Sequence, residues 1–218
     1  MVMQKEAKEV INKLKVAVGL FLRNTTSYLL FLWLVLRKSQ PISLSHKSAI
    51  VFSPHQDDET LGCGGAIALK KQQGVSVKVV FMTDGRYGSL QPMPTDKFID
   101  LRKQEATDAL NHLGVPPEDI MFLDRLDGSL ANLTGEQRQG LIEQLVQLLK
   151  QIAPQEAYVP HRKDFHADHE ATYDLVKTAI AQSGMNVELL QYPIWIFWQN
   201  PLSFQLQRQD LELSLIHI

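Results

Sequence analysis

Residues 49–65 read AIVFSPHQDDETLGCGG, an apolar run that leads through a charged turn into a glycine-containing segment. This order predicts a strand over 48–53 and a helix over 58–73, with the turn between them. In open α/β sheets such a turn lies at the carboxyl end of a strand, where ligands bind. The three adjacent carboxylates at 57–59 would repel one another unless a cation or a helix amino terminus compensated them. The turn is therefore a candidate cation site.

The rest of the chain repeats this alternation of strand and helix. Further strands are expected at 75–81, 120–123, 158–159 and 187–190, and further helices at 96–113, from Thr134 and from about Asp168. The alternation predicts an α/β fold, a Rossmann-like and mostly parallel sheet flanked by helices. Right-handed crossovers place the carboxyl ends of all its strands at one edge. The histidine-rich stretch from His161 to His169 would therefore lie at the same edge as His55.

Composition sets limits on the class of protein. The chain has 218 residues, of which 44% are apolar and 21% charged, so it can bury the core of one main domain. Its net charge of -2 gives no reason to expect nucleic acid as a partner. The single cysteine, Cys63, excludes an internal disulfide and fits a reducing compartment. We therefore expect a cytoplasmic protein, with Cys63 packed between a helix and the sheet.

The first forty residues differ from the remainder. Residues 5–22 place apolar side chains at helical spacing, opposed by charged ones, which predicts an amphipathic helix. Residues 28–36 then form an apolar run that is shorter than the roughly 20 residues of a bilayer span. A longer window would place Arg23 near its middle, at a cost of about 2.5 to 3.5 kcal/mol. We expect a helical extension over residues 1–40.

Three arrangements of this extension remain open: a helix in the membrane interface, helices packed on the domain or on a partner, and a true membrane span. Peripheral membrane contact would run through residues 5–36. A secretory signal is not expected, because Glu6 and Glu9 interrupt the positive amino-terminal region. Residues 39–41 would link the extension to a domain over 46–218.

The two histidine-containing stretches together carry the residue types of a metal site. His55 in the first stretch and His166 and His169 in the second supply imidazoles, and the turn supplies carboxylates. His166 and His169 are three residues apart, so they share a face if the helix has begun. Two imidazoles and a carboxylate, with an open position for water, are typical of a hydrolytic zinc site.

Two motifs carry a resemblance to a known family. PHQDDE at 54–59 resembles the His-Pro-Asp-Asp-Glu signature of the LmbE-like (PIG-L) family of zinc-dependent N-acetylglucosaminyl deacetylases. HADH at 166–169 resembles that family's second signature, His-Pro-Asp-His, and TDG at 83–85 ends the intervening strand as in the family. The resemblance covers about 48–191. It implies removal of an N-acetyl group from an N-acetylglucosamine-containing conjugate, which could be a small molecule or a glycolipid.

The resemblance also implies roles for individual residues. His55, Asp58 and His169 would bind Zn²⁺, with another divalent metal such as Fe²⁺ as an alternative. Asp57 would be the general base that takes a proton from the attacking water. The products would be acetate and a free amino sugar.

Further roles follow from the second motif and from two arginines. His166, in its protonated form, would stabilise the tetrahedral oxyanion, and Asp168 would hold His166 and favour its charged form. Arg86 and Arg102 are candidates for binding an anionic part of the substrate. Arg102 could equally pair with Glu105, three residues away.

The chain departs from the family pattern in a few places. Gln56 and Ala167 stand where the family usually has proline, and neither position supplies a ligand. Trp195 and Trp198 are expected to be core residues. The chain stops soon after them, in a tail that we interpret as truncated or non-native.

Parts of the sequence are also compatible with other functions. Gly62, Gly64 and Asp84 imitate part of a dinucleotide fingerprint, but Ile67 occupies its third glycine position and carboxylates occupy the turn. The alternatives that remain are a zinc-dependent amide hydrolase with a non-sugar substrate and a non-catalytic zinc-binding or carbohydrate-binding protein.

Overall fold

The computed structural model describes residues 2–37, 45–88 and 93–196. The expected linker at 39–41, Trp198 and the end of the chain lie outside these residues. The helices and strands are α1 (Val2–Arg37), β1 (Ala49–Ser53), α2 (Asp58–Gln72), β2 (Val77–Thr83), α3 (Thr95–His112), η1 (Pro117–Asp119), β3 (Ile120–Arg125), η2 (Leu130–Asn132), α4 (Gly135–Ile152), β4 (Glu156–Pro160), α5 (Ala167–Ser183) and β5 (Glu188–Tyr192).

Five parallel strands form one sheet in the order β3-β2-β1-β4-β5. The fold is therefore the expected α/β arrangement, and every strand predicted from the sequence is present within a few residues of its expected bounds. The chain builds outward from β1 through β2 to β3, and then returns to add β4 and β5 on the other side. The direction of winding reverses between β1 and β4, which is where such sheets bind ligands.

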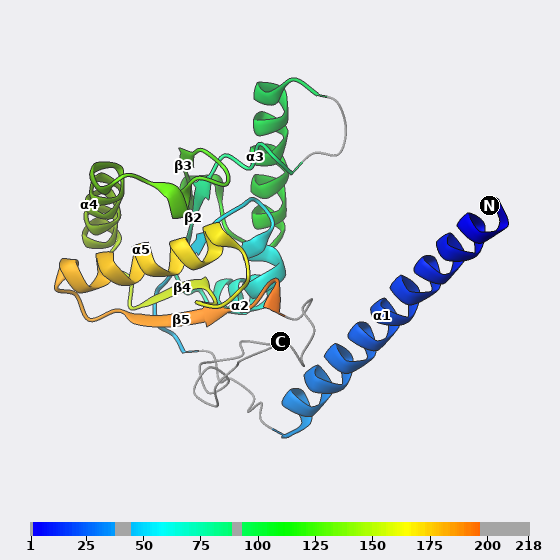
Figure 1. Ribbon diagram of the computed structural model, residues 1–218. Coiled ribbons are helices and arrows are strands. Elements are labelled where there is room, and N and C mark those ends of the chain that lie inside the picture. Colours follow the sequence, from blue (N-terminus) through cyan, green and yellow to red (C-terminus); the bar gives the residue numbers. More distant parts are fainter. Residues whose placement is uncertain (1, 38–44, 89–92, 197–218) are drawn as a thin grey trace.

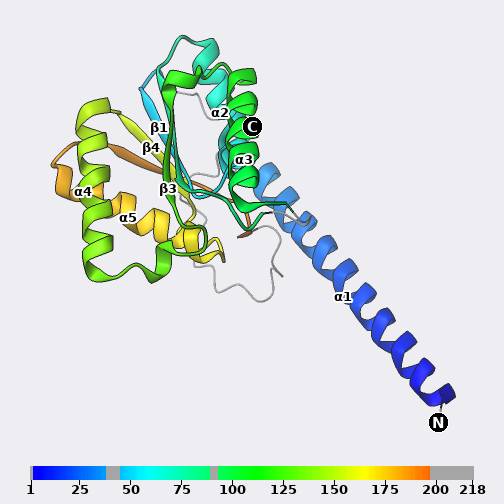
Figure 2. The ribbon, with the colours of Figure 1, turned by 90° about the horizontal axis from the view of Figure 1, so that it is seen from above.

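Helices cover both faces of the sheet, and the strands are apolar because both of their faces are buried. Ile50 and Phe52 of β1 face the core formed with α4 and α5. Val51, the residue between them, packs with Ile67 of α2 and Leu110 of α3 on the opposite face. Figure 2 shows the sheet between these two pairs of helices. This three-layer packing holds the β1 and β4 ends in fixed positions.

Small residues at the start of α2 let this helix approach the sheet closely. A Cβ atom added to Gly62 would lie 2.2 Å from Cδ2 of Tyr192 on β5, so only glycine fits there. Cys63 is buried, as expected from the sequence, and packs in the core between α2 and the sheet.

The expected capping box is present at the start of α4, where Thr134 and Gln137 each accept a hydrogen bond from the other's backbone N–H.

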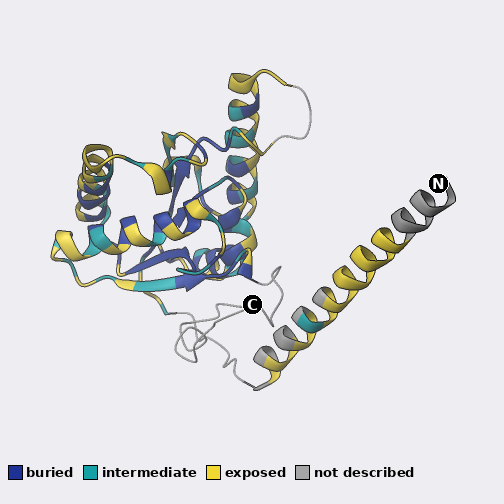
Figure 3. Cartoon of the chain, in the orientation of Figure 1, coloured by how far each residue is buried: buried dark blue, intermediate teal, exposed yellow. Residues whose placement is uncertain are grey.

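Helix α1 is a single element rather than a helix followed by a separate apolar run. It projects from the α/β domain in both ribbon views (Figures 1 and 2), and its described side chains are largely exposed (Figure 3). Within residues 2–37, 45–88 and 93–196, no helix has both the length and the apolar character needed to cross a membrane.

Candidate metal centre

The three predicted metal ligands converge at the carboxyl edge of β1 and β4. Asp58, the first residue of α2, is almost completely buried, and its Oδ2 lies 3.0 Å from Nδ1 of His55. The same oxygen lies 3.1 Å from Nε2 of His169 in the first turn of α5. Tetrahedral zinc, with ligand atoms about 2.0 to 2.1 Å away, places those atoms about 3.3 Å apart. The measured separations are close to this spacing.

His169 has a nitrogen that fits a metal ligand. Its Nε2 is buried and makes no hydrogen bond with any described residue, despite its proximity to Asp58. Its Nδ1 lies 2.7 Å from Oδ2 of Asp164, so the proton sits on Nδ1 and the lone pair on Nε2 is free to bind a metal. The donor set of two imidazoles and one carboxylate, with this orphaned nitrogen, therefore fits zinc.

Asp164 is a functional residue that the sequence interpretation missed. It is fully buried, and its second oxygen, Oδ1, accepts hydrogen bonds from the backbone N–H groups of Ile194 and Ile196, both at 3.0 Å. These bonds fix the carboxylate that orients His169. Its position within the stretch from His161 to His169 was the available signal.

The opposite side of the His55 ring faces two further carboxylates. Nε2 of His55 lies 3.2 Å from Asp127 and 3.4 Å from Asp168. Asp168 also accepts backbone hydrogen bonds from Gly128 at 2.7 Å and Leu130 at 3.0 Å. Asp127 and Asp168 can therefore accept a hydrogen bond from an Nε2–H group of His55. With its proton on Nε2, His55 would present the lone pair of Nδ1 to a metal beside Asp58.

Among the described residues, two groups of side chains bring one ligand atom each within 4.8 Å of one another: His55, His166 and His169, and His55, Asp127 and Asp168. Neither group includes Asp58, whose Oδ2 lies 3.0 Å from His55 and 3.1 Å from His169. The second group includes Asp127, which follows β3 at the same sheet edge and was not predicted. Backbone N–H groups donate to Asp127 and Asp168, and the N–H group of His55 likewise donates to Oδ2 of Asp58 at 3.1 Å. We favour the set with Asp58 because that oxygen lies close to both imidazoles, including the unbonded Nε2 of His169.

The charges in the site depend on one another. Burial lowers the pKa of His55, but hydrogen bonds with Asp127, Asp168 and Asp58 outweigh it and raise the pKa to about 11. Burial likewise opposes the charged form of Asp58, yet His169 and His55 hold the pKa of that carboxyl well below its ordinary value. His55 is therefore protonated in the metal-free protein, and a metal that binds it must displace a proton.

His166 lies beside this cluster, with its ring 4.7 Å from that of His169. Burial, together with the neighbouring His169 and His55, lowers the pKa of His166. Its Nδ1 is buried and unbonded in the described part of the chain, and among the described hydrogen bonds none joins it to Asp168. The expected support of His166 by Asp168 therefore rests on charge alone.

Asp57 and Arg102 face one another across the entrance to the site. The Asp57 side chain is half-exposed, and its Oδ2 lies 3.2 Å from the Arg102 guanidinium. Glu105 is farther away, at 3.9 Å, so Asp57 is the nearer partner of Arg102. Arg86 instead pairs with Asp84, with Nε donating at 2.9 Å, and it does not line the pocket.

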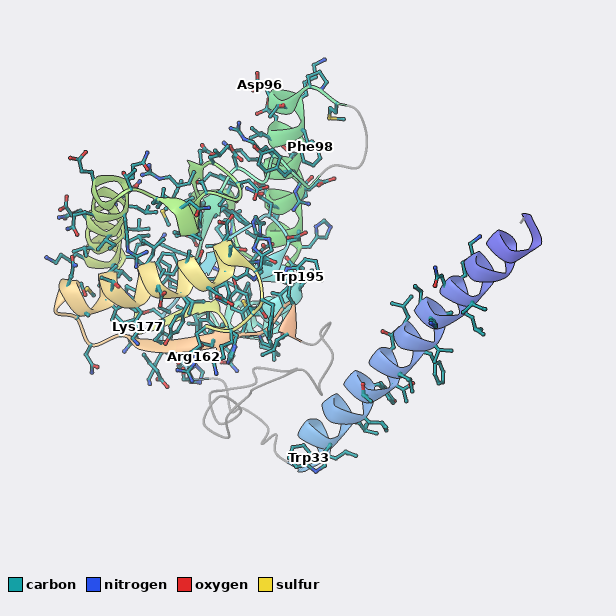
Figure 4. The ribbon with its side chains drawn as sticks, viewed as in Figure 1. Trp33, Asp96, Phe98, Arg162, Lys177 and Trp195 are labelled. Carbon is teal, nitrogen blue, oxygen red and sulfur yellow. The ribbon has the colours of Figure 1, made fainter. Side chains whose placement is uncertain are left out.

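A pocket of about 320 Å³ opens in front of these groups. The residues that line it are His55, Asp57, Asp58, Leu61, Gly85, Tyr87, Gly88, Arg102, Asp127, His166, Ile194 and Trp195. Trp195 is 45% exposed and stacks on His166, with their ring centroids 6.3 Å apart (Figure 4). The prediction that Trp195 is a core residue is therefore wrong. Tyr87, 70% exposed, supplies a second aromatic side chain to the pocket.

Comparison with known proteins places the chain in a family. The family model described as PIG-L, GlcNAc-PI de-N-acetylase, matches residues 50–180. The uncharacterized deacetylase YaiS of Escherichia coli (strain K12) is 33% identical over 132 residues, which cover 58% of this chain and 64% of that protein. A probable N-acetyl-alpha-D-glucosaminyl L-malate deacetylase 2 of Bacillus subtilis (strain 168) is 27% identical over 135 residues, covering 60% and 59%. The chain thus spans less than two thirds of either relative.

Solved structures share the fold. The N,N'-diacetylchitobiose deacetylase of Pyrococcus horikoshii has a TM-score of 0.58 at 24% identity, covering 74% of this chain and 67% of that one. The 4-carboxy-2-hydroxymuconate hydratase of Pseudomonas putida KT2440 has a TM-score of 0.55 at 26% identity, covering 65% and 62%. Because the family model matches more than half of the chain and spans both histidine-containing stretches, the chain belongs to the PIG-L (LmbE-like) family of deacetylases.

Proposed function

We propose that the protein is a zinc-dependent deacetylase that removes the N-acetyl group from an N-acetylglucosamine-containing conjugate. The observation that carries this proposal is the convergence of His55 and His169 on one oxygen of Asp58, beside a pocket open to solvent. Family membership and the two deacetylase relatives support the reaction class. When bound, zinc would polarise the acetamide carbonyl and lower the pKa of a water molecule to about 7.

Asp57 is the general base in this proposal. It lies directly before the proposed ligand Asp58, lines the pocket, and keeps one side of its carboxylate toward solvent. The Arg102 guanidinium, 3.2 Å away, orients that carboxylate without burying it. Asp57 would take a proton from the attacking water as the new carbon–oxygen bond forms.

His166 is the group placed to move a proton on the other side of the site. It lines the pocket and is held against Trp195 on one side and close to His169 on the other. His166 would take up a proton from solvent and give it to the departing amine as the carbon–nitrogen bond breaks, while the proton that Asp57 takes from the water returns to solvent. A lowered pKa makes the protonated form of His166 a ready proton donor. Asp168 would add favourable charge to the protonated form.

The substrate class is proposed from the pocket and from the family. A volume of about 320 Å³ is at the small end of ligand pockets, which suits a group of about the size of one sugar. Trp195 and Tyr87 present exposed aromatic surface there. The descriptions of the family and of the Bacillus subtilis relative both name N-acetylglucosamine-type groups, so we extend that substrate class to this chain.

The test is acetate release from N-acetylglucosamine, from a panel of its glycosides, and from N-acetyl amino acids as non-sugar amides. The full chain is stripped with a chelator and assayed before and after addition of Zn²⁺ or Fe²⁺. We expect metal-dependent release of acetate and free amine in equal amounts from a glycoside. Release from the amino acids alone would favour the non-sugar amide hydrolase, and metal binding without turnover on any substrate would favour a binding protein.

A further inference from the structure

Helix α1 lies outside the segment matched by the family model, and the proposed chemistry does not use it. Its apolar side chains are nevertheless displayed to solvent along its described length. Those more than half exposed include Leu14, Phe21, Leu22, Tyr28, Leu29 and Leu36. Figure 3 shows exposed positions on successive turns of α1, and Figure 4 places Trp33 near its carboxyl end. An exposed apolar surface of this extent indicates that α1 binds another surface.

The charge of this part of the chain favours an anionic partner. Between Glu9 and Asp57 the sequence has no acidic residue, while it contains several lysines and arginines. Lys13 and Lys15 are exposed on α1, within reach of any surface that the helix contacts. From Val10 to Arg37, α1 carries only positive charges, so this part of the helix is complementary to a bilayer of anionic lipids.

A second copy of the chain is the main rival as partner. Ile11, Leu14 and Val18 have the three- and four-residue spacing of a coiled-coil seam. Two further features favour lipid over a second helix. The nine apolar residues over 28–36 make more than two helical turns, so they fall on every side of a helix and one seam cannot cover them. From Val10 to Arg37 the helix has no acidic residue that could pair with the basic residues of a neighbouring copy; its two acidic residues, Glu6 and Glu9, lie in its first turns.

We propose that α1 is a membrane-surface anchor that binds anionic bilayers. Its apolar side chains would insert at the boundary between headgroups and acyl chains, and its basic side chains would lie at the lipid phosphates. The anchor would place the catalytic domain at a lipid surface. This inference does not depend on the deacetylase activity, and its test uses no substrate.

The experiment is co-sedimentation of the full chain with vesicles of phosphatidylcholine alone and of an equal mixture of phosphatidylcholine and phosphatidylglycerol. We expect binding to the anionic vesicles that weakens as salt is added. Each basic residue near an anionic surface contributes about 1 kcal/mol, or about fivefold in affinity. The double variant Lys13→Gln/Lys15→Gln should therefore bind about 25-fold more weakly. The matched control Lys150→Gln/Lys177→Gln, with the same change of charge on α4 and α5, should bind as the unmodified chain does.

A second variant tests the apolar contribution. Phe21→Gln/Leu29→Gln/Leu36→Gln leaves the charge unchanged and should weaken binding by about 1,000-fold or more, because each of the three large apolar side chains contributes about tenfold or more on burial. Circular dichroism and the melting temperature of each variant check that the domain is folded. Light scattering on the free chain tests whether a second copy of the chain is the partner of α1. The proposal would be overturned if the unmodified chain forms a stable dimer that this variant dissociates, and if the unmodified chain does not bind anionic vesicles. Equal binding by the unmodified chain and both variants would overturn it as well.

Discussion

At the scale of single residues, Asp164 sets the orientation of a proposed metal ligand. Its Oδ2 holds the Nδ1–H group of His169 at 2.7 Å, and two backbone N–H groups hold its Oδ1. In Asp164→Asn a neutral amide replaces the carboxylate, and it has one acceptor oxygen in place of two. The Nδ1–H group of His169 then loses its charged acceptor, and the tautomer of His169 is no longer fixed. We expect zinc affinity to fall about 10- to 100-fold.

Competition with a chromogenic chelator measures this change. Asp174→Asn, on the exposed side of α5, the helix that carries His169, is the matched control and should retain the original affinity. Unchanged affinity in Asp164→Asn would show that His169 is held by packing alone, or that it does not bind the metal.

Glu59 gives the metal-free protein a specific pH dependence. Its carboxyl is fully buried, and burial raises the pKa of Glu59 from 4.5 to about 7. Between these two values the folded chain holds a proton that the unfolded chain has lost, so the free energy of unfolding falls as pH rises through this window. The loss attributable to Glu59 is at most about 3 kcal/mol.

Denaturant titrations of the metal-free chain across pH 4.5 to 7 test this dependence. Glu59→Gln cannot lose that proton, so its stability should rise relative to the unmodified chain as pH increases. The exposed Glu118→Gln should follow the unmodified chain. If the Glu59→Gln and unmodified curves stay parallel, burial does not raise this pKa.

At the scale of elements, the contact between α2 and β5 fixes the start of α2 over the sheet. A Cβ atom at Gly62 would lie 2.2 Å from the ring of Tyr192, which is fully buried and donates a hydrogen bond to the carbonyl of Phe52 at 2.8 Å. The ring has no room to move, so Gly62→Ala should lower the free energy of unfolding by about 1 to 3 kcal/mol.

Gly64→Ala is the matched comparison for this helix. A Cβ atom there meets its nearest neighbours at 3.6 Å, which is ordinary contact. Alanine favours a helix over glycine by up to about 1 kcal/mol, so this variant should be neutral or slightly stabilised. Chemical denaturation of both variants distinguishes them, and equal effects would mean that the close approach to Tyr192 relaxes at little cost.

At the scale of the whole molecule, the edge that carries the site could be predicted because alternating strands and helices leave few topologies open. That rule brought His55 and His169 together although they are far apart in the sequence. It could not identify Asp164 or Asp127, because which carboxylate orients a histidine depends on loop conformation. The position of Trp195 was missed for a related reason, since an apolar side chain can line a pocket as well as a core.

The arginines and the amino-terminal region show a further limit of prediction. Arg102 lies at the pocket and Arg86 does not, a distinction set by their ion pairs with Asp57 and Asp84. Helical spacing indicated the amphipathic part of α1, whereas its continuity over Val2–Arg37 was not predicted because the polar residues near its middle interrupt the apolar pattern. Metal binding, catalysis and substrate identity remain predictions.

In the proposed site, His55, Asp58 and His169 hold a metal while Asp57 performs proton transfer. Bound zinc and acetate release are measured on the same samples of the unmodified chain and Asp57→Asn, with the best N-acetylglucosamine glycoside as substrate. We predict equal zinc content and a fall in turnover of about 100-fold or more in the variant, since general-base catalysis contributes about 10²- to 10⁴-fold. Loss of zinc from Asp57→Asn, or unchanged turnover with zinc retained, would contradict this division of roles.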